Sequence, residues 1–152
     1  MHDLNCDTVV SYFDNQQGPR LLCRKPRGDI ELDQSRVDGI TKLMDLHESD
    51  DFFLHYYDGL LTVNYCFGIH DPSARGGEFM LMGSMIFHES KVDLGQIMDT
   101  LPVLKRRLKI LAKSLEKNRL VRDLLNRNYM RTQNPRKKYK TMRDELVKVL
   151  KR

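Results

Sequence analysis

Apolar and polar residues alternate most regularly in the middle of the chain. Two segments, Phe52–Tyr57 and Leu60–Ile69, are rich in aromatic and aliphatic residues and flank the dipeptide Asp58-Gly59. Asp-Gly suits the positive φ angles of a two-residue type I′ turn, so these segments predict a β-hairpin. From Leu61 onward, the odd positions of the second segment are apolar and the even positions are small or polar. This alternation is typical of an antiparallel strand that packs against helices.

A third strand after this hairpin and an earlier hairpin complete the predicted sheet. Glu78–His88 is apolar at both odd and even positions, which predicts a central strand covered on both faces. Near the N-terminus, Thr8–Phe13 and Arg20–Arg24 predict two more strands. Gly18 and Pro19 lie in the predicted turn between them, where both residue types are favoured. The sequence therefore predicts five strands.

The segment Leu32–His47 predicts the first helix. Its apolar residues recur at steps of three and four, which places them on one helix face. Asp33 is a suitable N-cap, and Leu32 before it can contact Val37 as a hydrophobic staple. The predicted order is therefore two strands, one helix, three strands and then further helices.

Beyond Lys91 the apolar period changes from that of a strand to that of a helix. Apolar residues recur at steps of three and four from Leu94 to Leu115. This stripe fits a coiled coil or a helix laid across a sheet, and the interruption at Pro102 favours the sheet. We expect Pro102 to kink the helix or to begin a second one, and the helical pattern to continue toward Tyr129.

A last amphipathic segment follows a break in the helical pattern. Gln133, Asn134 and Pro135 form the break, and residues 136–152 place Tyr139, Met142, Leu146 and Val149 on one side of a basic helix. We therefore divide the chain into an α+β domain over residues 1–132 and a basic amphipathic helix over residues 133–152.

Charge divides the chain near the point where the hydrophobic period changes. Residues 1–90 contain 7 Lys and Arg against 15 Asp and Glu, a net charge of −8. Residues 91–152 contain 19 against 6, a net charge of +13, so the overall +5 conceals a polarised molecule. Basic helical regions attract acidic proteins, phosphates or anionic lipids. The predicted contact residues for such a partner are Lys105, Arg106, Arg107, Arg136, Lys137, Lys138 and Lys140.

Residue patterns for catalysis or for metal binding are absent from the sequence. The histidines and cysteines do not have the spacing of a metal site, and no nucleophile elbow or phosphate-binding loop is present. Cys6, Cys23 and Cys66 are expected to be buried or half-buried reduced thiols. The N-terminal residues lack the features of a secretory signal, and no apolar run reaches the ~20 residues of a membrane span. We therefore expect a cytoplasmic protein that is not an enzyme and that uses no cofactor.

The order of elements and one short segment resemble a known family. Phe13, Gly18 and Pro19, within residues 10–22, resemble the opening of longin-type domains in DENN-module and nitrogen-permease-regulator-like proteins. The predicted order also resembles the profilin-like layout of longin domains, whereas roadblock domains usually begin with a helix. The resemblance implies a non-enzymatic module that binds small GTPases, longin or roadblock partners, or trafficking factors. It does not extend to vesicle fusion, because the final segment is too short for a fusion helix.

Three functions from different classes stay open on sequence grounds. The first is a protein–protein adaptor, a homo- or heterodimer that uses open sheet edges and binds a small GTPase or another longin or roadblock domain. The second is a nucleic-acid-binding protein that uses the basic helical region. The third is a peripheral protein of an anionic membrane surface that uses the last amphipathic helix. We expect the adaptor, because the acidic strand region repels a polyanion.

Overall fold

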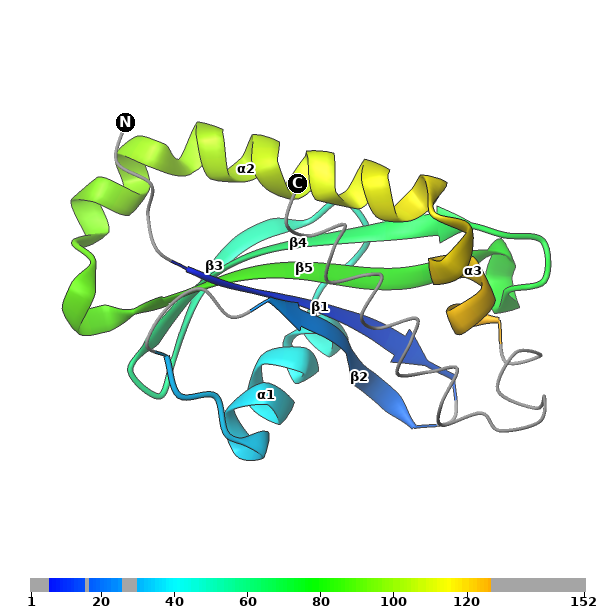
Figure 1. Ribbon diagram of the computed structural model, residues 1–152, viewed down its shortest axis with the longest axis horizontal. Helices are drawn as coiled ribbons and strands as arrows, with labels where there is room; N and C mark the ends of the chain where they lie inside the picture. Colours follow the sequence, from blue (N-terminus) through cyan, green and yellow to red (C-terminus); the bar gives the residue numbers. More distant parts are fainter. Residues whose placement is uncertain (1–5, 16, 26–29, 127–152) are drawn as a thin grey trace.

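Five antiparallel strands form one sheet between two helical layers (Figure 1). The computed structural model describes residues 6–15, 17–25 and 30–126. The strands are β1 (Asp7–Asp14), β2 (Gly18–Lys25), β3 (Phe52–Tyr57), β4 (Leu60–His70) and β5 (Glu78–His88), in the spatial order β2-β1-β5-β4-β3. The first helix follows β2 and the long helix follows β5, which confirms the predicted α+β fold.

The central position predicted for the apolar strand β5 is confirmed. β5 pairs with β1 along one side and with β4 along the other. Met82 and Ile86 on one face, and Leu81 and Phe87 on the other, are all 0% exposed. The strand is therefore apolar on both faces because helices cover both faces of the sheet.

The turn between β1 and β2 is shorter than the sequence predicts. Gly18 and Pro19, which we expected in the turn, are the first residues of β2 and lie opposite Asp14 and Phe13. Gly18 supplies the positive φ of 79° that the turn requires. Pro19 is tolerated in β2 because this strand is an edge of the sheet, where a missing backbone donor leaves no ladder bond unmade.

The first helix is shorter than the predicted Leu32–His47. It comprises α1 (Gln34–Thr41) and a 3₁₀ turn, η1 (Lys42–Leu46). The predicted N-cap is correct, because Asp33 Oδ1 accepts a hydrogen bond from the backbone N–H of Arg36 at 2.8 Å. The 3₁₀ turn tightens the helix end and buries Leu43 and Met44.

The long helix α2 (Leu94–Lys117) lies across the sheet and contacts β4 and β5, as the leucine stripe predicts. Pro102 lies inside α2, so the expectation that it begins a second helix is wrong. Pro102 is exposed, and so is Met98, whose carbonyl would otherwise accept a bond from residue 102. Water can therefore solvate that carbonyl, which makes the proline tolerable.

The helical pattern breaks at Asn118 instead of continuing toward Tyr129. Asn118 has extended backbone angles, φ −84° and ψ 116°, and separates α2 from α3 (Arg119–Leu125). Its side-chain oxygen accepts a bond from the N–H of Leu120 at 2.8 Å, so it caps the second helix. The predicted features at residue 129, at residues 133–135 and over residues 136–152 lie outside the described residues.

The two faces of the sheet carry separate hydrophobic cores. The α2-side core contains the odd-numbered residues of β4 and β5 together with Ile97, Leu104, Leu108 and Leu115 of α2. The α1-side core is smaller and consists of Val9, Ile30, Ile40, Leu43, Met44, Leu60, Cys66, Met82 and Ile86. Three of these residues, Ile40, Leu43 and Met44, come from α1 and η1.

All three cysteines are buried, as the sequence predicts. Burial, together with the nearby Asp51 carboxylate, raises the pKa of the Cys66 thiol to about 11. Among the described residues, no group of three or more His, Cys, Asp and Glu side chains is placed to hold a metal ion. No helix within the described ranges is long and apolar enough to cross a bilayer.

Candidate interaction surface

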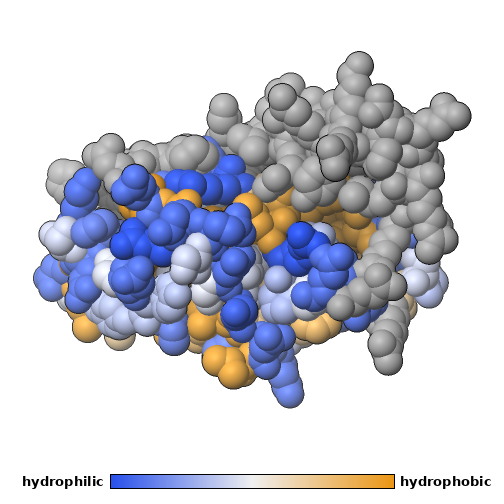
Figure 2. Space-filling model, turned by 90° about the horizontal axis from the view of Figure 1, so that it is seen from below, coloured by the Kyte–Doolittle hydropathy of each residue, from blue (hydrophilic) through white to orange (hydrophobic). Residues whose placement is uncertain are grey.

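An acidic surface lies largely on the α1 side of the sheet and continues to the strand ends at Asp50 and Asp58. Residues 31–58 contain eight carboxylates against Arg36 and Lys42, a net charge of −6, and all eight carboxylates are exposed. Arg36 is ion-paired with one of them, since its Nε lies 3.0 Å from Asp58 Oδ2. Figure 2 views the molecule from this side, and hydrophilic residues (blue) cover much of its described surface.

A basic surface lies on the outer side of α2. Lys105, Arg106, Arg107, Lys109 and Lys113 are all exposed, and no acidic residue occurs between positions 100 and 115. The sequence predicted the first three as contact residues, and the helix adds the last two. The remaining predicted residues Arg136, Lys137, Lys138 and Lys140 lie outside the described residues.

Four of these basic residues surround a groove that sequence reasoning missed. The groove has a volume of about 340 Å³ and is lined by Pro102, Lys105, Arg106, Lys109, Ile110 and Lys113. Ile110 is 57% exposed, and Met98, one helical turn before Pro102, is 53% exposed. Both are apolar residues that fall outside the leucine stripe. Their position on the polar side of the helix was the sequence signal that could have indicated the groove. We call Met98, Arg106, Lys109, Ile110 and Lys113 the outer face of α2.

Lys105 differs from the other basic residues because it also contacts the sheet. Its Nζ lies 5.5 Å from the centroid of the Phe52 ring, which is a cation–π contact between α2 and β3. Arg107 does not line the groove. Of the three residues predicted from sequence, Lys105 and Arg106 therefore line the groove, and Lys105 also makes the cation–π contact with β3.

The predicted turn at Asp58 and Gly59 serves the hairpin and also contacts α1. Their φ angles are 49° and 76°, the positive values that a type I′ turn uses. The ion pair between Asp58 and Arg36 then ties this turn to the first helix. Its role is structural, as for Gly18 and Pro19.

The strand β3 forms one edge of the described sheet, and its outer backbone groups face away from β4. The backbone N–H of Cys66 donates to the carbonyl of Asp51 at 2.9 Å, which sets the alternation of bonded pairs. By that alternation the N–H and C=O groups of Phe52, Leu54 and Tyr56 point outward. The side chains of β3 carry no formal charge apart from a titratable histidine. Within the described ranges no strand pairs with this edge, so it is open for pairing with another strand.

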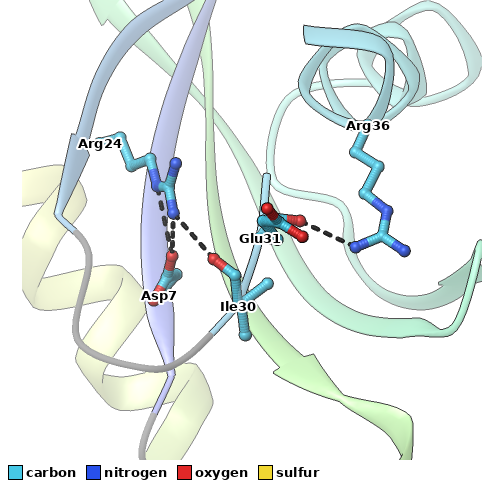
Figure 3. A network of polar contacts seen from close by, with 5 residues as sticks. All are labelled: Asp7, Arg24, Ile30, Glu31 and Arg36. Carbon is cyan, nitrogen blue, oxygen red and sulfur yellow. Dashed lines mark hydrogen bonds and ion pairs between the residues drawn. The ribbon is translucent and has the colours of Figure 1, made fainter. Parts of the chain in front are cut away.

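A half-buried ion pair holds the chain where it enters α1 (Figure 3). Arg24 Nη2 donates to Asp7 Oδ2 at 2.7 Å and to the carbonyl of Ile30 at 3.2 Å, and Asp7 is 0% exposed. Arg36 Nη1 donates to the carbonyl of Glu31 at 2.8 Å. These bonds join β1 and β2 to the segment before α1, so their role is to position that helix. The sequence signal was an acidic residue at the start of an apolar strand.

Buried polar atoms lie on the face of the sheet beneath α1. The sequence predicted only that this face of β4 carries small or polar residues. Ser11 Oγ, Asn64 Oδ1 and Ser84 Oγ are buried and have no hydrogen-bond partner among the described residues. Asn64 lies directly opposite Ser84 in the β4–β5 ladder. Asn64 Nδ2 does donate to Thr62 Oγ1 at 2.9 Å. The α1 side is therefore only partly satisfied in hydrogen bonding.

Comparison with known proteins identifies the fold. No protein-family model and no curated protein sequence matches the chain. The solved structure of the K. lactis Lst4 longin domain is similar, with a TM-score of 0.59 and 10% sequence identity. The match covers 97% of this chain and 94% of that chain. The resemblance drawn from sequence is confirmed at the level of fold, and the chain folds as a longin-like domain.

Proposed function

We propose that this protein is a non-enzymatic adaptor, a longin-like module that binds a protein partner in small-GTPase regulation or membrane trafficking. The longin-like fold supports this class of function. The partner we propose is a small GTPase or another longin or roadblock domain. The observation that carries the proposal is the open edge of β3.

The chemistry of the β3 edge fits a folded protein partner. The strand Phe-Phe-Leu-His-Tyr-Tyr contains no proline and no lysine, the residues that commonly block pairing at an edge. Tyr56 is 51% exposed beside outward backbone groups. A tyrosine offers a large contact area and a hydroxyl at low entropic cost, so tyrosine is enriched at protein interfaces. Backbone pairing gives such a contact its affinity, and Tyr56 would contribute to its specificity.

The test removes one outward backbone donor from β3 without removing a bond to β4. Tyr56→Pro deletes the N–H at an unpaired position of the edge, whereas Tyr56→Thr alters the side chain and keeps the N–H. The full chain serves as bait in a native lysate, and captured proteins are identified by mass spectrometry. We expect the wild type to recover a small GTPase or a longin or roadblock protein, and Tyr56→Thr to lose less of that recovery than Tyr56→Pro, because it keeps the backbone N–H. Tyr56→Pro should reduce that recovery by about tenfold.

Circular dichroism and thermal melting of Tyr56→Pro control for loss of the fold. Equal recovery by the proline and threonine variants would contradict the role of the β3 edge. Recovery of no protein from these three classes, by wild type that is folded and abundant in the assay, would contradict the proposed function itself. A catalytic activity of the purified chain would contradict its non-enzymatic part.

A further inference from the structure

The outer face of α2 combines basic and aliphatic side chains in a way that the protein-partner function does not use. Arg106, Lys109 and Lys113 line one groove with Ile110, and Met98 is exposed nearby. We infer that this face docks the protein on an anionic phospholipid surface. The inference goes beyond the proposed adaptor function and involves the opposite side of α2 from the sheet.

The positions of the charges favour a flat anionic surface. Residues 100–115 of α2 contain five basic residues and no acidic one, so the middle of the helix presents a single sign of charge. Asp99 and Glu116 lie at the two ends of this stretch. Residues 102–113, which line the groove, extend for about 16 Å along the helix axis. A planar layer of lipid phosphates can contact the whole of this stretch at once.

The acidic surface strengthens this preference for a plane. Residues 31–58, with a net charge of −6, belong largely to the other side of the sheet from α2 (Figure 1). The sheet separates a membrane that meets α2 from the carboxylates of residues 31–48, and screening weakens repulsion beyond the Debye length of about 8 Å. The charge distribution therefore orients the protein with its acidic surface away from the bilayer.

The apolar residues of the outer face distinguish lipid from nucleic acid. Single-stranded nucleic acids are held by aromatic side chains on which bases stack. The helix α2 contains no Phe, Tyr or Trp, and its exposed apolar residues are Leu94, Met98 and Ile110. Aliphatic side chains beside Lys and Arg are typical of surfaces that enter the headgroup region of a membrane. Among the residues that the structure describes, the α1 side lacks this combination, because its exposed Leu46 lies among carboxylates.

The test measures binding of the full chain to vesicles by co-sedimentation. Vesicles of phosphatidylcholine alone are compared with phosphatidylcholine and phosphatidylserine at about 3:1, since anionic lipid supplies the attraction. The test variant carries Arg106→Gln, Lys109→Gln and Lys113→Gln. Each basic residue near an anionic bilayer contributes roughly fivefold to binding, so the triple change should weaken it by about 100-fold. Binding of the wild type should also fall as salt is raised.

A second variant controls for net charge. Arg20→Gln combined with Lys42→Glu lowers the net charge by the same three units, and both residues are exposed on elements other than α2. This control should bind the anionic vesicles nearly as well as the wild type. Ile110→Ser should lower the affinity a few-fold, because less apolar surface then enters the headgroup region.

Four results would overturn the inference. The first is no binding of the wild type to the anionic vesicles, and the second is equal binding to neutral ones. The third is a triple variant that binds as well as the wild type, or as well as the charge control. The fourth is tighter binding of single-stranded RNA at the same salt concentration through the same three residues. None of these results bears on the β3 edge, so the adaptor function is judged separately.

Discussion

The two faces of the sheet differ in how completely they are apolar. On the α2 side, a helix of 24 residues covers β4 and β5, and the core beneath it consists of hydrophobic side chains. On the α1 side, a helix of 8 residues and a 3₁₀ turn contact β2 and share a smaller core with residues of β4 and β5. The residues beneath them include the buried polar side chains Ser11, Thr62, Asn64 and Ser84. On their α2 side, β4 and β5 therefore bury hydrophobic side chains, and on their α1 side they bury polar side chains as well.

This difference indicates which side of the sheet contributes more to stability and which helix can shift more easily. Apolar burial is the main favourable contribution to folding, so the α2 side should contribute most of the free energy of unfolding. A buried oxygen without a hydrogen-bond partner costs free energy, and three oxygens on the α1 side have no such partner within the described part of the chain. We expect α1 to be the element that can shift at the lower cost. The following changes test that comparison.

The largest expected effect is a cavity under α2. Leu108→Ala in α2 and Leu43→Ala in η1 remove the same atoms from buried side chains, which are 2% and 5% exposed. We expect Leu108→Ala to lower the free energy of unfolding by about 4 kcal/mol and Leu43→Ala by about 2–3 kcal/mol, because a short helix can move to fill its cavity. Urea unfolding measures both. A loss at Leu43 equal to or larger than that at Leu108 would break the comparison.

A methyl group at Gly39 tests how tightly α1 is held. A Cβ at this position would lie 2.4 Å from Cζ of the Tyr57 ring, so the ring or the helix must move. We expect Gly39→Ala to destabilise the protein by about 1 kcal/mol, since overpacking exceeds the gain in helix propensity.

The same glycine change in a Tyr57→Ala background gives the matched measurement. With the ring removed, Gly39→Ala should stabilise the protein by up to about 1 kcal/mol, the propensity difference between Gly and Ala. Thermal and urea unfolding of the four variants gives the coupling energy. Coupling near zero would show that the contact with Tyr57 does not hold α1 in place.

The smallest expected effect concerns the buried polar side chains on the face of the sheet beneath α1. Ser84→Ala removes a buried hydroxyl that has no partner among the described residues, so we expect stability to be unchanged or to rise by up to about 1 kcal/mol. Thr62→Val is the matched control. Its hydroxyl donates to the carbonyl of His55 at 3.2 Å and accepts from Asn64, so its loss should cost about 1 kcal/mol. If urea unfolding gives changes in stability of the same sign for both variants, the conclusion that hydrogen bonding on the α1 side is only partly satisfied is contradicted.

Sequence patterns predicted the elements that are decided locally. The Asp58-Gly59 turn and the alternation in β4 determine a hairpin from neighbouring residues alone, and both are present. The break at Asn118 was missed because asparagine is tolerated within helices and the apolar period continues past it. The burial of Thr62 and Asn64 was missed for a related reason. A small or polar face does not show from sequence whether a helix covers it.

The candidate surfaces also have features that the sequence predicts and features that depend on the fold. A run of basic residues from Lys105 to Arg107 is visible in the sequence, and α2 exposes all three. Which of them share a groove with Ile110 depends on the rotation of α2 about its axis, which the contacts with β4 and β5 determine. The open edge of β3 likewise depends on the spatial order of strands, which no single segment specifies.

The burial of all three cysteines makes this chain well suited to site-specific labelling. A maleimide reacts with an accessible thiolate, and Cys66, with a pKa of about 11, offers almost none at neutral pH. Cys6 and Cys23 are buried to a similar extent. A cysteine introduced at the exposed Ser114 of α2 would therefore be the preferred site for a fluorophore in the native protein. The colour and polarisation of that fluorophore would then follow encounters of α2 in real time, without removal of any native residue from the core.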